Sequence, residues 1–188
     1  MASSKVSICS GASLLVGAAP FSDMSDNTTS ARLTLNLFDD VQDDLLRAHP
    51  WSFATTRVKL SPLASKPTYG FKYEFNIPSD MIRLLSIDSF YVGQNFKLEG
   101  GRILANVSAL DLCYVFRNTD VSTWPSDFVN AVKYELASQI AYPIAKSDTL
   151  RQTLEQKAQY KLMVAKANNA METPSQHFKI NPLLQARY

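Results

Sequence analysis

Glycine, cysteine and histidine are scarce in this sequence, and each scarcity excludes a kind of site. Six glycines in 188 residues leave little material for a phosphate-binding loop, and neither G-x-x-x-x-G-K-[ST] nor G-x-G-x-x-G occurs. Two cysteines without C-x-x-C spacing, and two histidines, exclude the common zinc sites. The esterase motif G-x-S-x-G is also missing. The sequence therefore predicts no cofactor, no metal and no catalytic residue, and we expect reduced thiols.

Long apolar runs and a strong charge imbalance are missing as well. No stretch approaches the ~20 apolar residues of a membrane helix, so no membrane partner is expected. Serines and a glycine interrupt segment 6–19, which we interpret as a short helix rather than a signal peptide. The 19 basic and 17 acidic side chains leave a net charge of +2, too small to indicate nucleic-acid binding by itself.

Helical periodicity marks both ends of the chain. Leu33, Leu37, Val41 and Leu45 recur every four residues, which predicts a helix that His49-Pro50 ends. The same spacing returns over 128–144 and 150–171. These segments predict two further helices, and the proline at 143 is expected to kink or end the first of them.

The middle of the chain has the period of strands. Tyr69, Phe71, Tyr73 and Phe75 alternate with other residues, which predicts four aromatic rings on the inward face of one strand. A hairpin is expected to turn at residues 100–101, and 110–116 alternates again.

Together these patterns predict an α+β fold: a helical bundle with a small inserted antiparallel sheet or sandwich and an extended C-terminal arm. The expected parts are N-terminal helices in 1–50, the β insertion in 51–120, C-terminal helices in 121–172 and the tail in 173–188. The tail contains apolar residues without periodicity, so it either packs back on this protein or is ordered by another chain.

Two groups of side chains invite a chemical interpretation. Asp39, Asp40, Asp43 and Asp44 stack one helical turn apart, but no further ligand completes a metal site, so a solvated face or an acidic patch is favoured. The first 50 residues hold three basic and six acidic side chains, against 16 and 11 in the remainder. This division suits head-to-tail contact between copies.

Three motifs resemble one family. Residues 46–54 read Leu-Arg-Ala-His-Pro-Trp-Ser-Phe-Ala, residues 73–83 read Tyr-x-Phe-x-Ile-Pro-x-Asp-x-x-Arg, and Trp-Pro-x-x-Phe at 124–128 precedes an alanine-rich helix. Across about 5–172 the chain is similar to the tail tubular protein A, or head-to-tail adaptor, proteins of short-tailed phages and prophages. The signature residues concerned are His49, Pro50, Trp51, Phe53, Pro78, Asp80, Arg83 and Pro125.

The resemblance implies a structural role. Family members form a twelve-fold ring beneath the portal protein, carry the tail nozzle (a tail tubular protein B-like partner) and let DNA pass non-specifically through the lumen. It implies a virion tail or neck location after assembly in the host cytoplasm, with tail fibres as a further partner. The C-terminal arm would contact the portal through these residues: Phe178, Ile180, Leu183, Leu184 and Tyr188.

Independently of the family, the signature residues are interpreted as folding determinants rather than an active site. The proline at 50 ends a helix, and Trp51 and Phe53 supply apolar area where the chain enters the sheet. Pro78 and Asp80 indicate a turn, and Arg83 is expected to pair with Asp80 or with a neighbouring subunit. The proline at 125 suits the first turn of a helix.

Two alternatives stay open at this stage. One is a single-stranded nucleic-acid-binding module that stacks bases on three aromatic rings beside three lysines: Tyr69, Phe71, Tyr73, Lys59, Lys66 and Lys72. Tight single-strand binding by the isolated protein would favour it. The other is a small hydrolase that uses Cys113 or the Asp39–Asp44 carboxylates, although both cysteines lie on apparent core faces.

Overall fold

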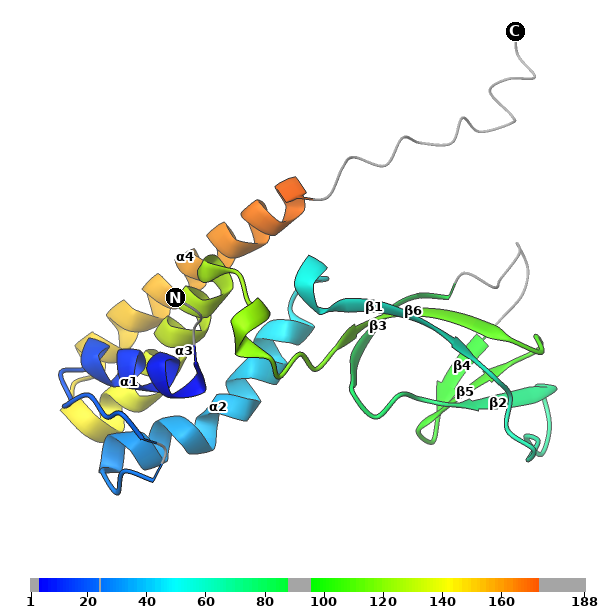
Figure 1. The fold of residues 1–188 in the computed structure, drawn as a ribbon, viewed down its shortest axis with the longest axis horizontal. Helices are drawn as coiled ribbons and strands as arrows, with labels where there is room; N and C mark the ends of the chain where they lie inside the picture. The colour runs from blue at the N-terminus through cyan, green and yellow to red at the C-terminus, as the bar shows by residue number, and fades with distance from the viewer. Residues whose placement is uncertain (1–3, 24, 88–95, 173–188) are drawn as a thin grey trace, which may run out of the picture.

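The computed structural model describes residues 4–23, 25–87 and 96–172 (Figure 1). Within these ranges the helices are α1 (Lys5–Leu15), α2 (Thr29–Arg47), α3 (Ser126–Ala145) and α4 (Asp148–Glu172), with short 3₁₀ turns η1 (Ser52–Ala54) and η2 (Val121–Thr123). The strands are β1 (Thr55–Leu60), β2 (Tyr73–Asn76), β3 (Met81–Ile87), β4 (Phe96–Glu99), β5 (Arg102–Ala105) and β6 (Leu110–Phe116). The predicted α+β class, with the sheets inserted between two pairs of helices, is confirmed.

Local capping chemistry sets the helix boundaries. Ser4 and Ser7 form a reciprocal capping box at α1, and the Thr28 hydroxyl accepts the Ala31 N–H at α2. α3 continues through the proline at 143 and ends two residues later, where Lys146 adopts a left-handed conformation. In the described part of the chain, no helix combines the length and the apolar character needed to cross a membrane.

The strands form two antiparallel sheets, of order β1-β6-β3 and β2-β5-β4. The hairpin between β4 and β5 turns where predicted, with Glu99 opposite Arg102. Gly100 and Gly101 have φ values of 57° and 74°, the left-handed pair that a two-residue hairpin turn requires. The pairing of β6 with both β1 and β3 places β6 in the middle of its sheet.

The expected strand of four inward-facing aromatics is wrong at its N-terminal end. β2 begins only at Tyr73, because Gly70 has a φ of 84° that extended backbone does not have. Phe75 is fully buried, whereas Tyr69 is 87% exposed in the loop before the strand. Only the second half of the alternation therefore contributes to the sheet core.

Two hydrophobic cores share strand β6. Val115 belongs to the bundle core, whereas Leu112 and Tyr114 belong to the core between the sheets. On α2 the predicted stripe is confirmed at Val41 and Leu45, which are buried, whereas Leu33 and Leu37 are only half-buried. At that N-terminal end Ala31 and Thr34 take the buried positions. The small Ala31 and Thr34 let neighbouring helices approach α2 more closely than leucines would.

Candidate functional site

The signature segment 46–54 forms the junction that joins the bundle to the first sheet (Figure 1). Trp51 is its centre: the side chain is 1% exposed, and its Nε1 donates to the Leu45 carbonyl at 2.8 Å. The indole ring meets Phe128 edge-on at 4.9 Å and lies 5.9 Å from Phe53. The predicted burial of Trp51 is confirmed, and α2, α3 and the entry to β1 are fixed against one side chain.

Asn169 on α4 holds the same segment through polar contacts that the sequence analysis missed. Its Oδ1 accepts from the Ser52 backbone N–H at 2.9 Å and from the Ser52 hydroxyl at 2.8 Å. Its Nδ2 therefore faces His49 Nε2 at 3.0 Å and the Pro50 carbonyl at 3.4 Å. The available signal was a polar residue on the inward stripe of α4, one turn after the buried Ala165.

His49 is held neutral by this arrangement. Partial burial is the main cause that lowers the pKa of its imidazole below the ordinary value of 6.5, and the charges of Lys166 and Arg83 lower it further. Because the Asn169 amide donates to Nε2, a protonated ring would set two donors against each other. The native state thus binds a proton on His49 less readily than the unfolded state does.

We therefore expect the His49 contribution to stability to be complete above pH 6.5 and to be lost as the pH falls below it. Thermal melts between pH 7.5 and 5 would measure this, with His49→Gln as the non-titrating control. The decline in Tm with falling pH should be steeper in the unmodified protein than in the variant. Parallel declines would contradict the assignment.

The second signature motif ties the sheet to the end of α2. The Pro78 carbonyl accepts from the Met81 N–H at 3.0 Å, which confirms the turn, and the Asp80 carboxylate accepts from the Tyr114 hydroxyl at 3.1 Å. Burial and this carboxylate raise the pKa of Tyr114 to about 12. The phenol therefore remains a hydrogen-bond donor.

Arg83 has a partner that the sequence analysis did not consider. Its Nη1 donates to the Arg47 carbonyl at 3.2 Å, and Arg47 in return donates to the Ile82 carbonyl at 2.8 Å. The last turn of α2 and strand β3 are thus joined by two reciprocal bonds. A cation at the C-terminal end of a helix is also electrostatically favourable.

The acidic cluster of α2 faces solvent and is partly neutralised within the chain. Asp39 pairs with Lys5 at 2.7 Å and Asp43 with Arg117 at 2.7 Å, so two carboxylates hold neighbouring elements together. Asp40 and Asp44 have no ion pair within the described ranges. In those ranges no group of three or more His, Cys, Asp or Glu side chains is placed to hold a metal ion.

Both cysteines are buried and free, as predicted. Burial is the main cause that raises the pKa of Cys9 to about 11, against smaller opposing effects of Lys5 and Thr34. Its thiol is therefore protonated and non-nucleophilic at neutral pH. Cys113 is buried on β6, the central strand of the first sheet.

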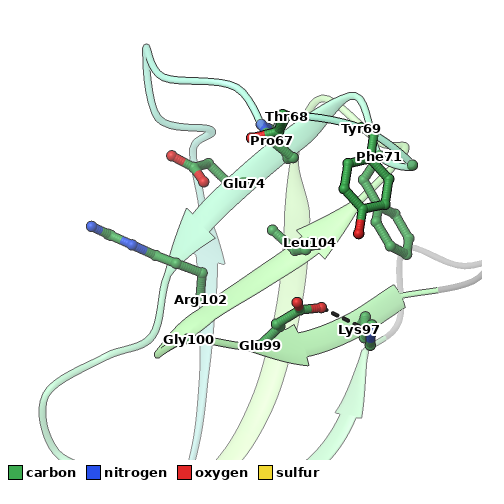
Figure 2. A pocket seen from close by; sticks show the side chains of 11 residues that line it. Pro67, Thr68, Tyr69, Phe71, Glu74, Lys97, Glu99, Gly100, Arg102 and Leu104 are labelled. Carbon is green, nitrogen blue, oxygen red and sulfur yellow. Dashed lines mark ion pairs between the residues drawn. The ribbon is translucent and has the colours of Figure 1, made fainter.

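A shallow depression of about 310 Å³ lies on the outer face of the second sheet (Figure 2). Tyr69 and Phe71 stand together on one side of it. The charged side chains that line it are Glu74, Lys97, Glu99 and Arg102.

The charges in this depression cancel, and Lys97 is paired with Glu99 at 2.8 Å. A groove for single-stranded nucleic acid needs uncompensated positive charge along the backbone path. Of the three aromatics in the nucleic-acid hypothesis, the lining includes Tyr69 and Phe71 but not Tyr73. Because the two carboxylates offset the two cations, this geometry gives the nucleic-acid alternative little support.

Six predicted residues remain: the signature proline at position 125, which the structure describes, and the five residues of the C-terminal arm. The Pro125 residue occupies the position just before α3, with φ −58° and ψ 146°, so it introduces the helix instead of lying in its first turn. The arm residues lie outside the described residues: Phe178, Ile180, Leu183, Leu184 and Tyr188.

No family model matches the chain, and no curated protein matches it.

Proposed function

We propose that this protein is a structural head-to-tail adaptor of a short-tailed phage. In this proposal about twelve copies form a ring between the portal protein and the tail nozzle, through which DNA passes. The supporting observation is the junction, where residues of the resembling motifs join the bundle to the first sheet. Trp51 packs on Phe128, Ser52 is bound by Asn169 of α4, and Arg83 of β3 donates to the Arg47 carbonyl of α2. An adaptor has to hold its two binding faces at a fixed separation, and this junction supplies that stiffness.

The same junction would position the C-terminal arm. The Ser52 hydroxyl, which donates to Asn169 Oδ1, also lies 3.1 Å from the Glu172 carboxylate, and Asn169 accepts from the Ser52 backbone N–H just after α2. The last turn of α4 is therefore anchored where residues 173–188 begin. An arm that starts from a fixed point can reach the portal with a smaller loss of conformational entropy than one on a loose helix end.

In the ring, each copy would contact two neighbours, the portal and the nozzle, with tail fibres as a further partner. Permanent assemblies of this kind typically bury more than ~2,000 Å² at each interface. DNA in the lumen would be contacted through its phosphates alone, so these contacts should weaken as salt increases. The location would be the tail or neck of the virion, after assembly in the host cytoplasm.

A gene deletion tests the proposed function. A phage lacking this protein should produce DNA-filled heads without tails, and adding the purified protein to those heads should restore attachment of the nozzle. Complete, infectious particles from the deletion strain would contradict the proposal.

A further inference from the structure

The outer face of α4 has an exposed apolar stripe. Tyr160, Met163 and Met171 are 58%, 61% and 82% exposed, and Ala167 is exposed between them. Their spacing puts these four residues on one side of the helix, opposite the buried Leu154, Ala158 and Ala165 that pack toward α3. A surface helix normally presents polar residues on its outer side, so this stripe indicates a contact surface.

Two lysines lie beside the N-terminal part of the stripe, both on the same side of it. Lys157 and Lys161 are one helical turn apart, and neither has an ion pair within the described ranges. Like charges at this spacing on a helix repel each other. An acidic partner would relieve that repulsion.

The outer face of α2 carries the complementary pattern. Asp40 and Asp44 are also one turn apart, exposed, and without an ion pair in the described part of the chain. Toward the N-terminal end of the same helix, Leu33 and Leu37 are half-buried beside the core. From its N-terminal to its C-terminal end, α2 therefore presents an apolar segment followed by an acidic one.

The two faces lie on opposite sides of the molecule. Figure 1 shows α4 along one side of the bundle and α2 along the other, with α3 between them, and α3 packs on both. One molecule therefore cannot bring its own lysines to its own aspartates across this bundle. A second copy can, and contact between two different faces repeats from copy to copy and forms a ring where the rotation between copies closes.

The spacing along the two helices also matches. On α2, the midpoint of Asp40 and Asp44 lies seven residues from the midpoint of Leu33 and Leu37. On α4, the midpoint of Lys157 and Lys161 lies between six and seven residues from the centre of the apolar stripe. At 1.5 Å per residue both separations are about 10 Å. The acidic end of α2 meets the basic end of α4 only when the helices run antiparallel.

We propose that α4 of one copy packs antiparallel on α2 of the next, with Lys157 and Lys161 facing Asp40 and Asp44. The apolar stripe of α4 then covers Leu33 and Leu37. This inference rests on the proposed function, because it names the surfaces through which the ring forms.

Charge reversal tests the contact in the full-length protein. Sedimentation velocity would measure self-association with and without purified portal rings. The variants K157E/K161E and D40K/D44K should each associate at least tenfold more weakly than the unmodified protein. Their equimolar mixture should regain association, because each variant then offers the complementary charge to the other, and the combined four-substitution variant should regain it alone.

The control is K66E/K72E, which makes the same change in net charge as K157E/K161E on exposed lysines of the β insertion and should associate normally. All substituted positions are exposed or half-buried, so Tm should stay close to that of the unmodified protein. As an independent readout, oxidising the L37C/M163C variant should give a ladder of disulfide-linked multimers. Neither native cysteine should contribute, since both are buried.

The outcomes separate this inference from the proposed function. Rings formed equally well by the unmodified and charge-reversed proteins, or no recovery on mixing, would overturn the α2–α4 contact and leave the adaptor proposal standing. Unmodified protein that forms no assembly, alone or with portal rings, would overturn both.

Discussion

Replacing Trp51 with alanine should lower the free energy of unfolding by about 3–5 kcal/mol. The indole is 1% exposed and contacts Phe53 and Phe128, so its removal leaves a cavity where α2, α3 and β1 meet. The Leu45 carbonyl also loses the Nε1 hydrogen bond. For a domain of this size, thermal unfolding should show a Tm lower by roughly 6–20 °C.

Two further variants isolate the cause. Trp51→Phe keeps most of the ring volume and removes only the N–H donor, so its loss should be clearly smaller than that of alanine. Tyr160→Ala removes a largely exposed aromatic of α4 and should change stability by no more than about 0.5 kcal/mol. An unchanged Tm in Trp51→Ala would show that the junction does not stabilise the fold.

Deleting residues 174–188 should abolish attachment to portal-containing heads while leaving the described domain folded. The junction contacts found in the described residues, including the bonds of Asn169 to Ser52, all lie at or before Glu172, so the truncated protein should melt at nearly the same temperature as the full chain. Attachment can be measured by co-sedimentation of the protein with DNA-filled, tailless heads.

The attachment assay and the melting temperature test two different claims about the arm. A truncated protein that still attaches would contradict the role given to the arm. A truncated protein that melts much earlier would show instead that the arm packs back on the domain, which was the other interpretation of its aperiodic apolar residues.

The elements were largely predictable from sequence because their causes are local. The proline at 50 ends α2, and the Gly100–Gly101 pair supplies the two positive φ values of the hairpin. The burial of Trp51 followed from its size and its place between a helix and a strand. Tyr69 was misplaced because Gly70 interrupts an alternation that otherwise has the period of a strand.

The contacts of the junction were less predictable because their partners are distant in sequence. Asn169 binds Ser52 across 117 positions, and Arg83 donates to a backbone carbonyl at the end of α2. Periodicity likewise located a buried face on α2 but could not show which neighbours would pack there. Toward its N-terminal end α2 buries the small Ala31 and Thr34, whereas Leu33 and Leu37 are half-buried.

Electron microscopy of the purified protein mixed with its portal rings tests the central claim most directly. The proposal predicts axial views of a closed collar with a central channel, one copy for each portal subunit position, stacked on the portal. Portal rings that remain bare at saturating protein concentration would contradict it.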